Sequence, residues 1–121
     1  MNISEASKIV GISSYTLRYY EKIGLIKNIV RDKCGNRQYE KNDIEWIRFL
    51  MKLKDIRMPI TQMKLYAELR YKGNETIGQR SEMLKVQKEQ LLKRIKELTE
   101  GVELLDRKLE IYKKIGGNKN E

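Results

Sequence analysis

Residues 13–22, SSYTLRYYEK, combine two kinds of side chain that bind anions, the cationic groups of Arg and Lys and the phenol hydroxyls of Tyr. On a helix, with about 100° between neighbours, these groups share one arc of the surface: Tyr15, Arg18, Tyr19 and Lys22. Such a face suits DNA, because cations neutralise phosphates, phenol hydroxyls donate to phosphate oxygens and arginine also reaches guanine edges. An ordinary solvated helix face, with its tyrosines packed on the next element, would contain the same residues.

Two further tyrosines accompany this face. Tyr20 points to the far side of the helix with Leu17, so we expect its ring in the core, with a hydroxyl still able to reach the DNA backbone. Arg37 and Tyr39 are two residues apart, and on a strand they would share a face. A hairpin that presents Arg and Tyr beside the basic helix would clamp the neighbouring DNA backbone.

Short helices must position these residues. We expect one helix over about 5–10, capped by Ser4 and ended by Gly11. A second helix, capped by Ser13 or Ser14, should run to about Ile23 and stop at Gly24. Two short helices joined by a tight turn, the second of them basic, are typical of a helix-turn-helix.

The rest of the head is predicted to be a wing and a helix pair. Residues 25–40 place β-prone residues on both sides of the turn DKCGN, which favours a small β-hairpin. Asp43 should cap a helix that ends before Pro59, and Pro59 should open another to about Tyr71. Apolar residues at helical spacing are the expected core of this pair: Ile44, Trp46, Ile47, Phe49, Leu50, Met51, Leu53, Ile60, Met63, Tyr66, Ala67 and Leu69.

A heptad repeat dominates the C-terminal part of the chain. Its members alternate at steps of four and three, with Lys88 as the polar exception: Leu84, Leu91, Ile95, Leu98, Val102, Leu105, Leu109 and Tyr112. Because a chain this short cannot bury so long a stripe, a second copy is the economical partner, although the helix could also fold back on its own domain. We therefore predict a mainly α protein: a winged helix-turn-helix DNA-binding head with two further helices over 1–72, a linker over 73–80, a coiled-coil dimerisation helix over 81–115 and a flexible tail over 116–121.

The composition of the chain limits the classes of function that it can have. The net charge of +9 is concentrated in residues 1–72, where 15 Lys/Arg face eight Asp/Glu, a net of +7; residues 73–121 have 11 against nine, a net of +2. A basic head favours a polyanionic partner. The absence of His, the single Cys and the lack of a glycine-rich phosphate loop argue against an enzyme, a metal site or a bound cofactor. With neither a signal peptide nor a membrane span in the sequence, we expect a soluble, cytoplasmic protein.

The one thiol, Cys34, lies in the predicted wing turn. Arg31, Lys33 and Arg37 are near it in sequence and would favour a reactive thiolate, which makes it a candidate thiol sensor. The simpler interpretation is a partly exposed surface cysteine that has no sensing role.

Two stretches carry a family resemblance. ISEASKIVGISSYTLRYYEKIGLI and GNRQYEKNDIEWIRFLMKLKDIRMPI closely resemble MerR-type transcription regulators, and TLRYYEKIGLI is very specific for that family. The resemblance covers almost the whole head, and the heptad helix matches the dimerisation helix of the family. It implies DNA contacts for Arg18, Tyr19 and Tyr20, with Arg37 and Tyr39 as wing contacts, whereas Tyr15 and Lys22 depend on the helical projection alone.

The resemblance also implies how such a protein works. It implies a homodimer with antiparallel long helices that binds double-stranded promoter DNA whose polymerase-recognition elements are too far apart. Distorting that DNA would let RNA polymerase engage both elements, so the polymerase is a partner only through the promoter. Because almost nothing follows the long helix, we expect a short form without a C-terminal effector domain. The effector, the operator and the choice between activation and repression are left open, and a basic-headed coiled-coil adaptor for RNA or an acidic protein is the alternative function.

Overall fold

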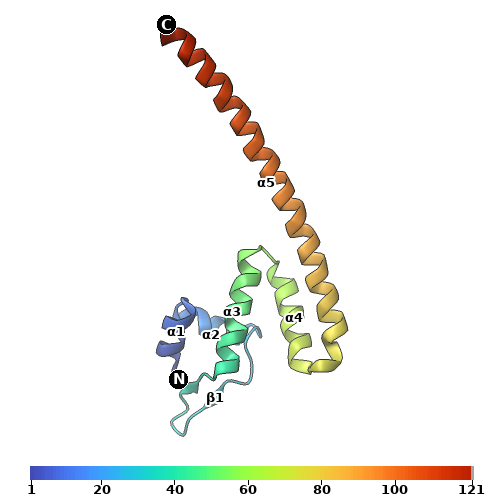
Figure 1. Cartoon of the computed structure of the whole chain (residues 1–121). Helices are drawn as coiled ribbons and strands as arrows, with labels where there is room; N and C mark the ends of the chain where they lie inside the picture. Colours follow the sequence, from blue (N-terminus) through green and yellow to red (C-terminus); the bar gives the residue numbers. More distant parts are fainter. Residues whose placement is uncertain (121) are drawn as a thin grey trace. The chain divides into compact units, whose positions relative to one another are not determined.

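The structure is a computed structural model that describes residues 1–120, apart from the side chains of residues 118–120. Its described part is mainly helical, with one two-stranded antiparallel sheet (Figure 1). The chain divides into two compact units, residues 1–83 and 84–121, which are considered separately. None of the described helices is both long and apolar enough to cross a membrane.

Two short capped helices open the first unit. α1 (Ile3–Val10) begins earlier than expected, because Asn2, and not Ser4, caps it through a reciprocal pair of hydrogen bonds with Glu5. α2 (Ser14–Lys22) begins at the predicted cap, where Ser13 Oγ accepts from the Thr16 N–H. Between them Gly11 has a φ of 76°, a left-handed conformation that favours glycine. The helix-turn-helix prediction is confirmed.

The wing is smaller than its sequence suggested. β1 (Val30–Arg31) pairs with β2 (Arg37–Gln38), with Arg31 opposite Arg37. Residues 32–36 form the turn, in which Asp32 Oδ1 accepts from the N–H groups of Cys34 and Asn36. Because β2 ends at Gln38, Tyr39 lies outside the strand in which it was predicted.

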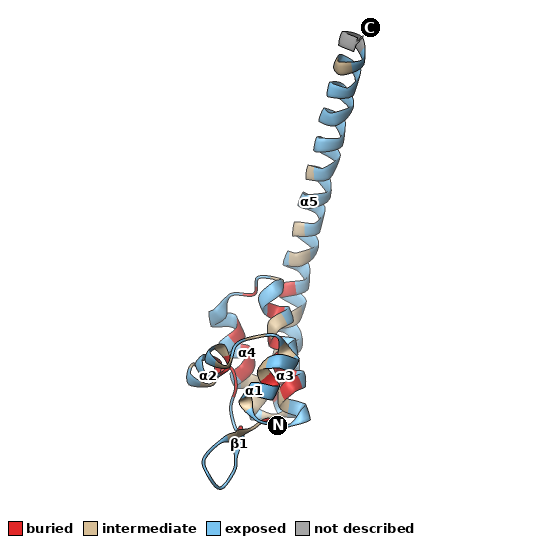
Figure 2. Ribbon diagram, turned by 90° about the vertical axis from the view of Figure 1, so that its left-hand side faces the viewer, coloured by how far each residue is buried: buried red, intermediate tan, exposed pale blue. Residues whose placement is uncertain are grey.

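A helix pair completes the core. α3 (Lys41–Asp55) begins after Glu40, so Asp43 stands one turn inside the helix and accepts from the Glu40 N–H. α4 (Ile60–Lys72) begins directly after Pro59, as predicted. Half of the buried apolar residues of the described chain, which Figure 2 draws in red, belong to these two helices: Ile44, Trp46, Ile47, Leu50, Leu53, Met63, Tyr66 and Ala67. Phe49 and Ile60 were expected in the core but are 37% and 47% exposed.

The predicted linker is largely structured. A 3₁₀ turn, η1 (Asn74–Thr76), leads directly into α5 (Ile77–Asn120), so the long helix begins four residues before the predicted 81. At its other end, the predicted tail over 116–121 is helical as far as Asn120, and Glu121 lies outside the described residues. A helix can continue through glycines because each costs only about 1 kcal/mol relative to alanine.

Candidate nucleic-acid interface

The outer face of α2 presents the four predicted anion-binding side chains together. They line one shallow groove of about 210 Å³: Tyr15, Arg18, Tyr19 and Lys22. Tyr15 is 78% exposed and Tyr19 48%, and within residues 1–120 neither Arg18 nor Lys22 forms an ion pair. Two cations and two phenol hydroxyls are therefore free to bind a phosphate backbone.

The opposite side of α2 is anchored in the core, as the helical projection predicts. Leu17 is fully buried and Tyr20 is 6% exposed. The Tyr20 carbonyl accepts hydrogen bonds from the N–H groups of Leu25 and Ile26, which ties the end of α2 to the chain that follows. Tyr19 and Tyr20 thus have different surroundings, although their ring centroids are only 6.2 Å apart.

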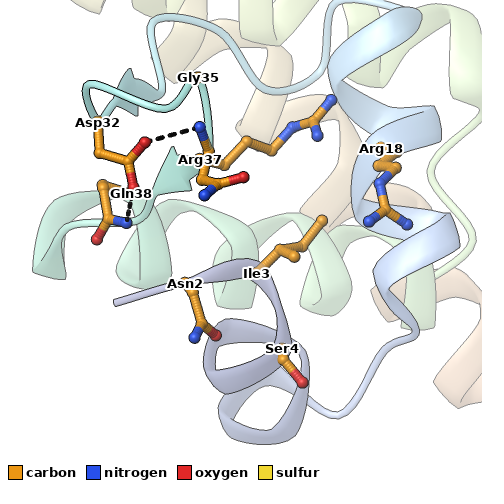
Figure 3. A pocket seen from close by; sticks show the side chains of 9 residues that line it. Asn2, Ile3, Ser4, Arg18, Asp32, Gly35, Arg37 and Gln38 are labelled. Carbon is orange, nitrogen blue, oxygen red and sulfur yellow. Dashed lines mark hydrogen bonds between the residues drawn. The ribbon is translucent and has the colours of Figure 1, made fainter.

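A second cleft adjoins this face. It has a volume of about 470 Å³ and lies between the start of α1, α2 and the wing (Figure 3). Seven of the nine residues that line it have polar or charged side chains: Asn2, Ser4, Arg18, Asp32, Asn36, Arg37 and Gln38, with Ile3 and Gly35 beside them. The first N–H groups of a helix lack intrahelical partners and attract anions. Arg18 lines both clefts, so it stands where the α2 face meets the wing.

Arg37 has a partner that the sequence analysis missed. Its Nε lies 2.8 Å from Glu21 Oε2, and both side chains are 21% exposed. Arg31 approaches the same carboxylate at 3.8 Å. Glu21 therefore holds the wing against α2, and much of the Arg37 charge is compensated. In the sequence, this pair is indicated only by Glu21, the single acidic residue within the basic segment RYYEK.

Tyr39 requires a correction. Its side chain is 1% exposed, and its hydroxyl is buried without a hydrogen-bond partner among the described residues. Its backbone is held by Met1, whose nitrogen donates to the Tyr39 carbonyl at 2.8 Å and whose carbonyl accepts from the Tyr39 N–H at 2.6 Å. Tyr39 is a core residue here, so it does not share an exposed face with Arg37, and the predicted wing contact through its side chain is wrong.

The buried hydroxyl makes Tyr39→Phe a stabilising change. Removing an unpartnered buried hydroxyl is expected to raise the free energy of unfolding by about 1 kcal/mol at neutral pH. Burial, and next the Glu21 carboxylate, raise the pKa of Tyr39 above 10.0. Above pH 10.0 the unfolded chain loses this proton before the folded protein does, so the free energy of unfolding of the wild-type protein falls as the pH rises toward the folded-state pKa. Below pH 10.0 this contribution to stability is fully present. The advantage of the Tyr39→Phe variant should therefore widen above pH 10.0. Urea denaturation across this pH range measures it; reduced stability or weakened DNA binding would contradict the core assignment.

Cys34 is exposed in the wing turn, and its N–H donates to Asp32. The arginines expected to activate it have other partners: Arg31 donates to the Gly35 carbonyl and Arg37 pairs with Glu21. Its role as a thiol sensor stays a prediction. Among the described residues, no group of three His, Cys, Asp or Glu side chains could hold a metal ion.

In the second unit, α5 presents the predicted apolar seam. Six of its members are between 50% and 70% exposed: Ile95, Leu98, Val102, Leu105, Leu109 and Tyr112. Leu84 and Leu91 are half-buried. An exposed apolar stripe of this length indicates a contact with another molecule.

Comparisons with known proteins show which family the chain belongs to. Residues 1–69 match the family model described as MerR HTH family regulatory protein. A relative from Haemophilus influenzae, named an uncharacterized HTH-type transcriptional regulator, is 37% identical over 111 residues, which span 92% of this chain and 82% of the relative.

Two solved structures resemble the chain closely. A MerR family transcriptional regulator from Listeria monocytogenes has a TM-score of 0.87 and 38% identity, covering 93% of this chain and 85% of its own. HiNmlR, described as a MerR family regulator lacking the sensor domain and bound to promoter DNA, has a TM-score of 0.83 and 36% identity, covering 93% and 90%. The predicted resemblance is confirmed, and the chain belongs to the MerR family of helix-turn-helix transcription regulators.

Proposed function

We propose that the protein is a homodimeric regulator that binds promoter DNA through the outer face of α2, flanked by the wing. The observation that carries this proposal is the group of four exposed anion-binding residues, with unpaired charges on Arg18 and Lys22 within the described part of the chain. The adjoining cleft at Arg18 and the exposed wing cations Arg31 and Lys33 would take the flanking backbone. Arg37 positions the wing through Glu21 rather than serving as a free cation.

Dimerisation is proposed from α5. An exposed heptad seam is stabilised when it packs against a second seam. A second copy of the same chain always supplies such a seam, so a homodimer is the simplest assembly. Two copies would present two α2 faces, which matches the two half-sites that dimeric helix-turn-helix proteins occupy.

The proposed output is a change in promoter geometry. Regulators of the MerR type act on promoters in which the spacer between the two polymerase-recognition elements is too long. Distorting such DNA costs on the order of several kcal/mol, which contacts at two half-sites can offset. RNA polymerase would then be affected through the DNA and not through direct contact, in the cytoplasm, where the promoter is accessible. HiNmlR, which lacks a sensor domain and is bound to promoter DNA, supports DNA binding by a relative of this length.

A selection experiment tests this function. A duplex pool with a randomised centre should yield an enriched operator, and fluorescence anisotropy should show tight binding with a steep decrease as salt increases. Single-stranded RNA of the same length is the competitor. Equal affinity for both nucleic acids with the same salt slope would exclude a specific promoter regulator.

The two adjacent tyrosines give a sharper test of the α2 face. Tyr19→Phe is expected to weaken operator binding by about threefold to tenfold, since it removes one hydroxyl donor to phosphate. Tyr20→Phe should leave affinity unchanged because its ring is buried. Both proteins are titrated with the selected operator. Equal losses for the two variants would overturn the division between contact and core.

A further inference from the structure

Hydrogen-bonded polar residues occupy the segment between α4 and the start of α5, where a linker was predicted. Thr76 is 4% exposed, and its hydroxyl shares one proton between the Leu69 carbonyl at 2.6 Å and the Gly73 carbonyl at 2.8 Å. The Thr76 N–H also donates to the Gly73 carbonyl, at 3.1 Å. A buried threonine whose donors are satisfied by the Leu69 and Gly73 carbonyls is an ordered part of the structure.

Arg80, in the first turn of α5, forms hydrogen bonds to the same segment. Its Nε donates to Thr76 Oγ1 at 3.0 Å, and its Nη2 donates to the Gly73 carbonyl at 3.2 Å. Gly73 itself has φ 105° and ψ −165°, a combination that essentially only glycine adopts. We call Gly73, Thr76 and Arg80 the polar joint; all three lie within the compact unit 1–83.

The same end of α4 is tied, on another side, to the segment that follows α2. The Tyr71 hydroxyl accepts from the Lys27 N–H at 2.9 Å. Trp46 Nε1 donates to the Leu25 carbonyl at 2.8 Å, and the Arg70 guanidinium lies 4.2 Å from the centre of the Trp46 ring. Directional bonds therefore run from the start of α5, through the last turn of α4, to the chain that anchors α2.

We propose that Thr76 and Arg80 determine which half-site spacing the dimer accepts. This inference depends on the proposed function, since it needs two α2 faces joined through α5. The joint bonds the first turn of α5 to the end of α4, so in a dimer that forms through α5 it limits how far each α2 face can shift. One added base pair displaces a half-site by about 3.4 Å along the DNA, and a rigid dimer cannot follow it without strain.

The test compares Thr76→Val with Thr76→Ser. Valine keeps the shape and removes the hydroxyl, whereas serine restores the donor and acceptor. Arg80→Gln removes the bonds from the α5 side, and Gln79→Ala is its exposed neighbouring control. Affinities are measured for duplexes whose two half-sites are separated by the selected spacer, by one base pair more and by one less. Light scattering checks the dimer, and a single half-site duplex checks the α2 face.

The wild-type protein and the Thr76→Ser and Gln79→Ala variants should prefer the selected spacer. In Thr76→Val and Arg80→Gln, discrimination between spacers is expected to fall by about tenfold, with half-site affinity and dimer mass unchanged. An unaltered spacer profile in Arg80→Gln, or in a folded Thr76→Val, overturns the inference while the proposed function stands. If the wild-type protein enriches no operator at all, the proposed function fails and this inference fails with it.

Discussion

Replacing Leu98 by aspartate is expected to make the protein monomeric. Leu98 lies in the middle of the α5 seam and is 70% exposed in the single chain, so it is free to be buried by a second copy. Placing an unpaired carboxylate in that contact costs several kcal/mol, which would weaken dimerisation by about a hundredfold or more. Sedimentation equilibrium on the full chain measures this effect directly.

The control is Gln90→Asp, which adds the same charge to an exposed position of α5 outside the seam. This variant should remain a dimer. A monomeric Leu98→Asp protein should also lose the affinity that comes from engaging two half-sites while keeping binding to one. A dimer that persists in Leu98→Asp would mean that the seam is not the contact.

Arg18→Gln is expected to be the most damaging single change on the DNA-binding face. Arg18 is exposed and lines both the α2 groove and the cleft beside the wing, so one guanidinium serves two parts of the proposed interface. Loss of an arginine contact to DNA costs about 1–3 kcal/mol, equivalent to about a tenfold to hundredfold weaker operator binding. Folding should be unaffected because Arg18 forms no ion pair among the described residues.

Arg107→Gln is the matched control for this change. It removes the same charge from an exposed position of α5 in the second unit. Any loss of affinity shared by both variants reflects net charge alone. Operator affinity for Arg18→Gln no lower than that for Arg107→Gln would remove Arg18 from the interface.

Features that depend on helical geometry could be predicted from the sequence. The separation of Tyr19 from Tyr20 follows from the rotation of about 100° per residue, and the structure places one outside and the other in the core. The seam of α5 was predictable for the same reason, since a repeat of seven residues returns to the same side of a helix.

Features that depend on contacts between distant residues were not predictable. The burial of Tyr39 comes with backbone pairing to Met1, 38 residues away, which no local alternation reveals. The partnership of Arg37 with Glu21 joins the wing to α2 across 16 residues. In the segment KGNETIG, polar composition is typical of a linker, but one buried hydroxyl and one guanidinium order it.

Hydroxyl-radical footprinting of the selected operator tests the central claim most directly. Two copies bound through their α2 faces and wings should protect two separated segments of equal extent, related by the symmetry of the dimer. Leu98→Asp should abolish this paired pattern at the same protein concentration. A single protected segment with the wild-type protein, or a paired footprint that survives Leu98→Asp, would contradict a dimer that binds two half-sites through α2.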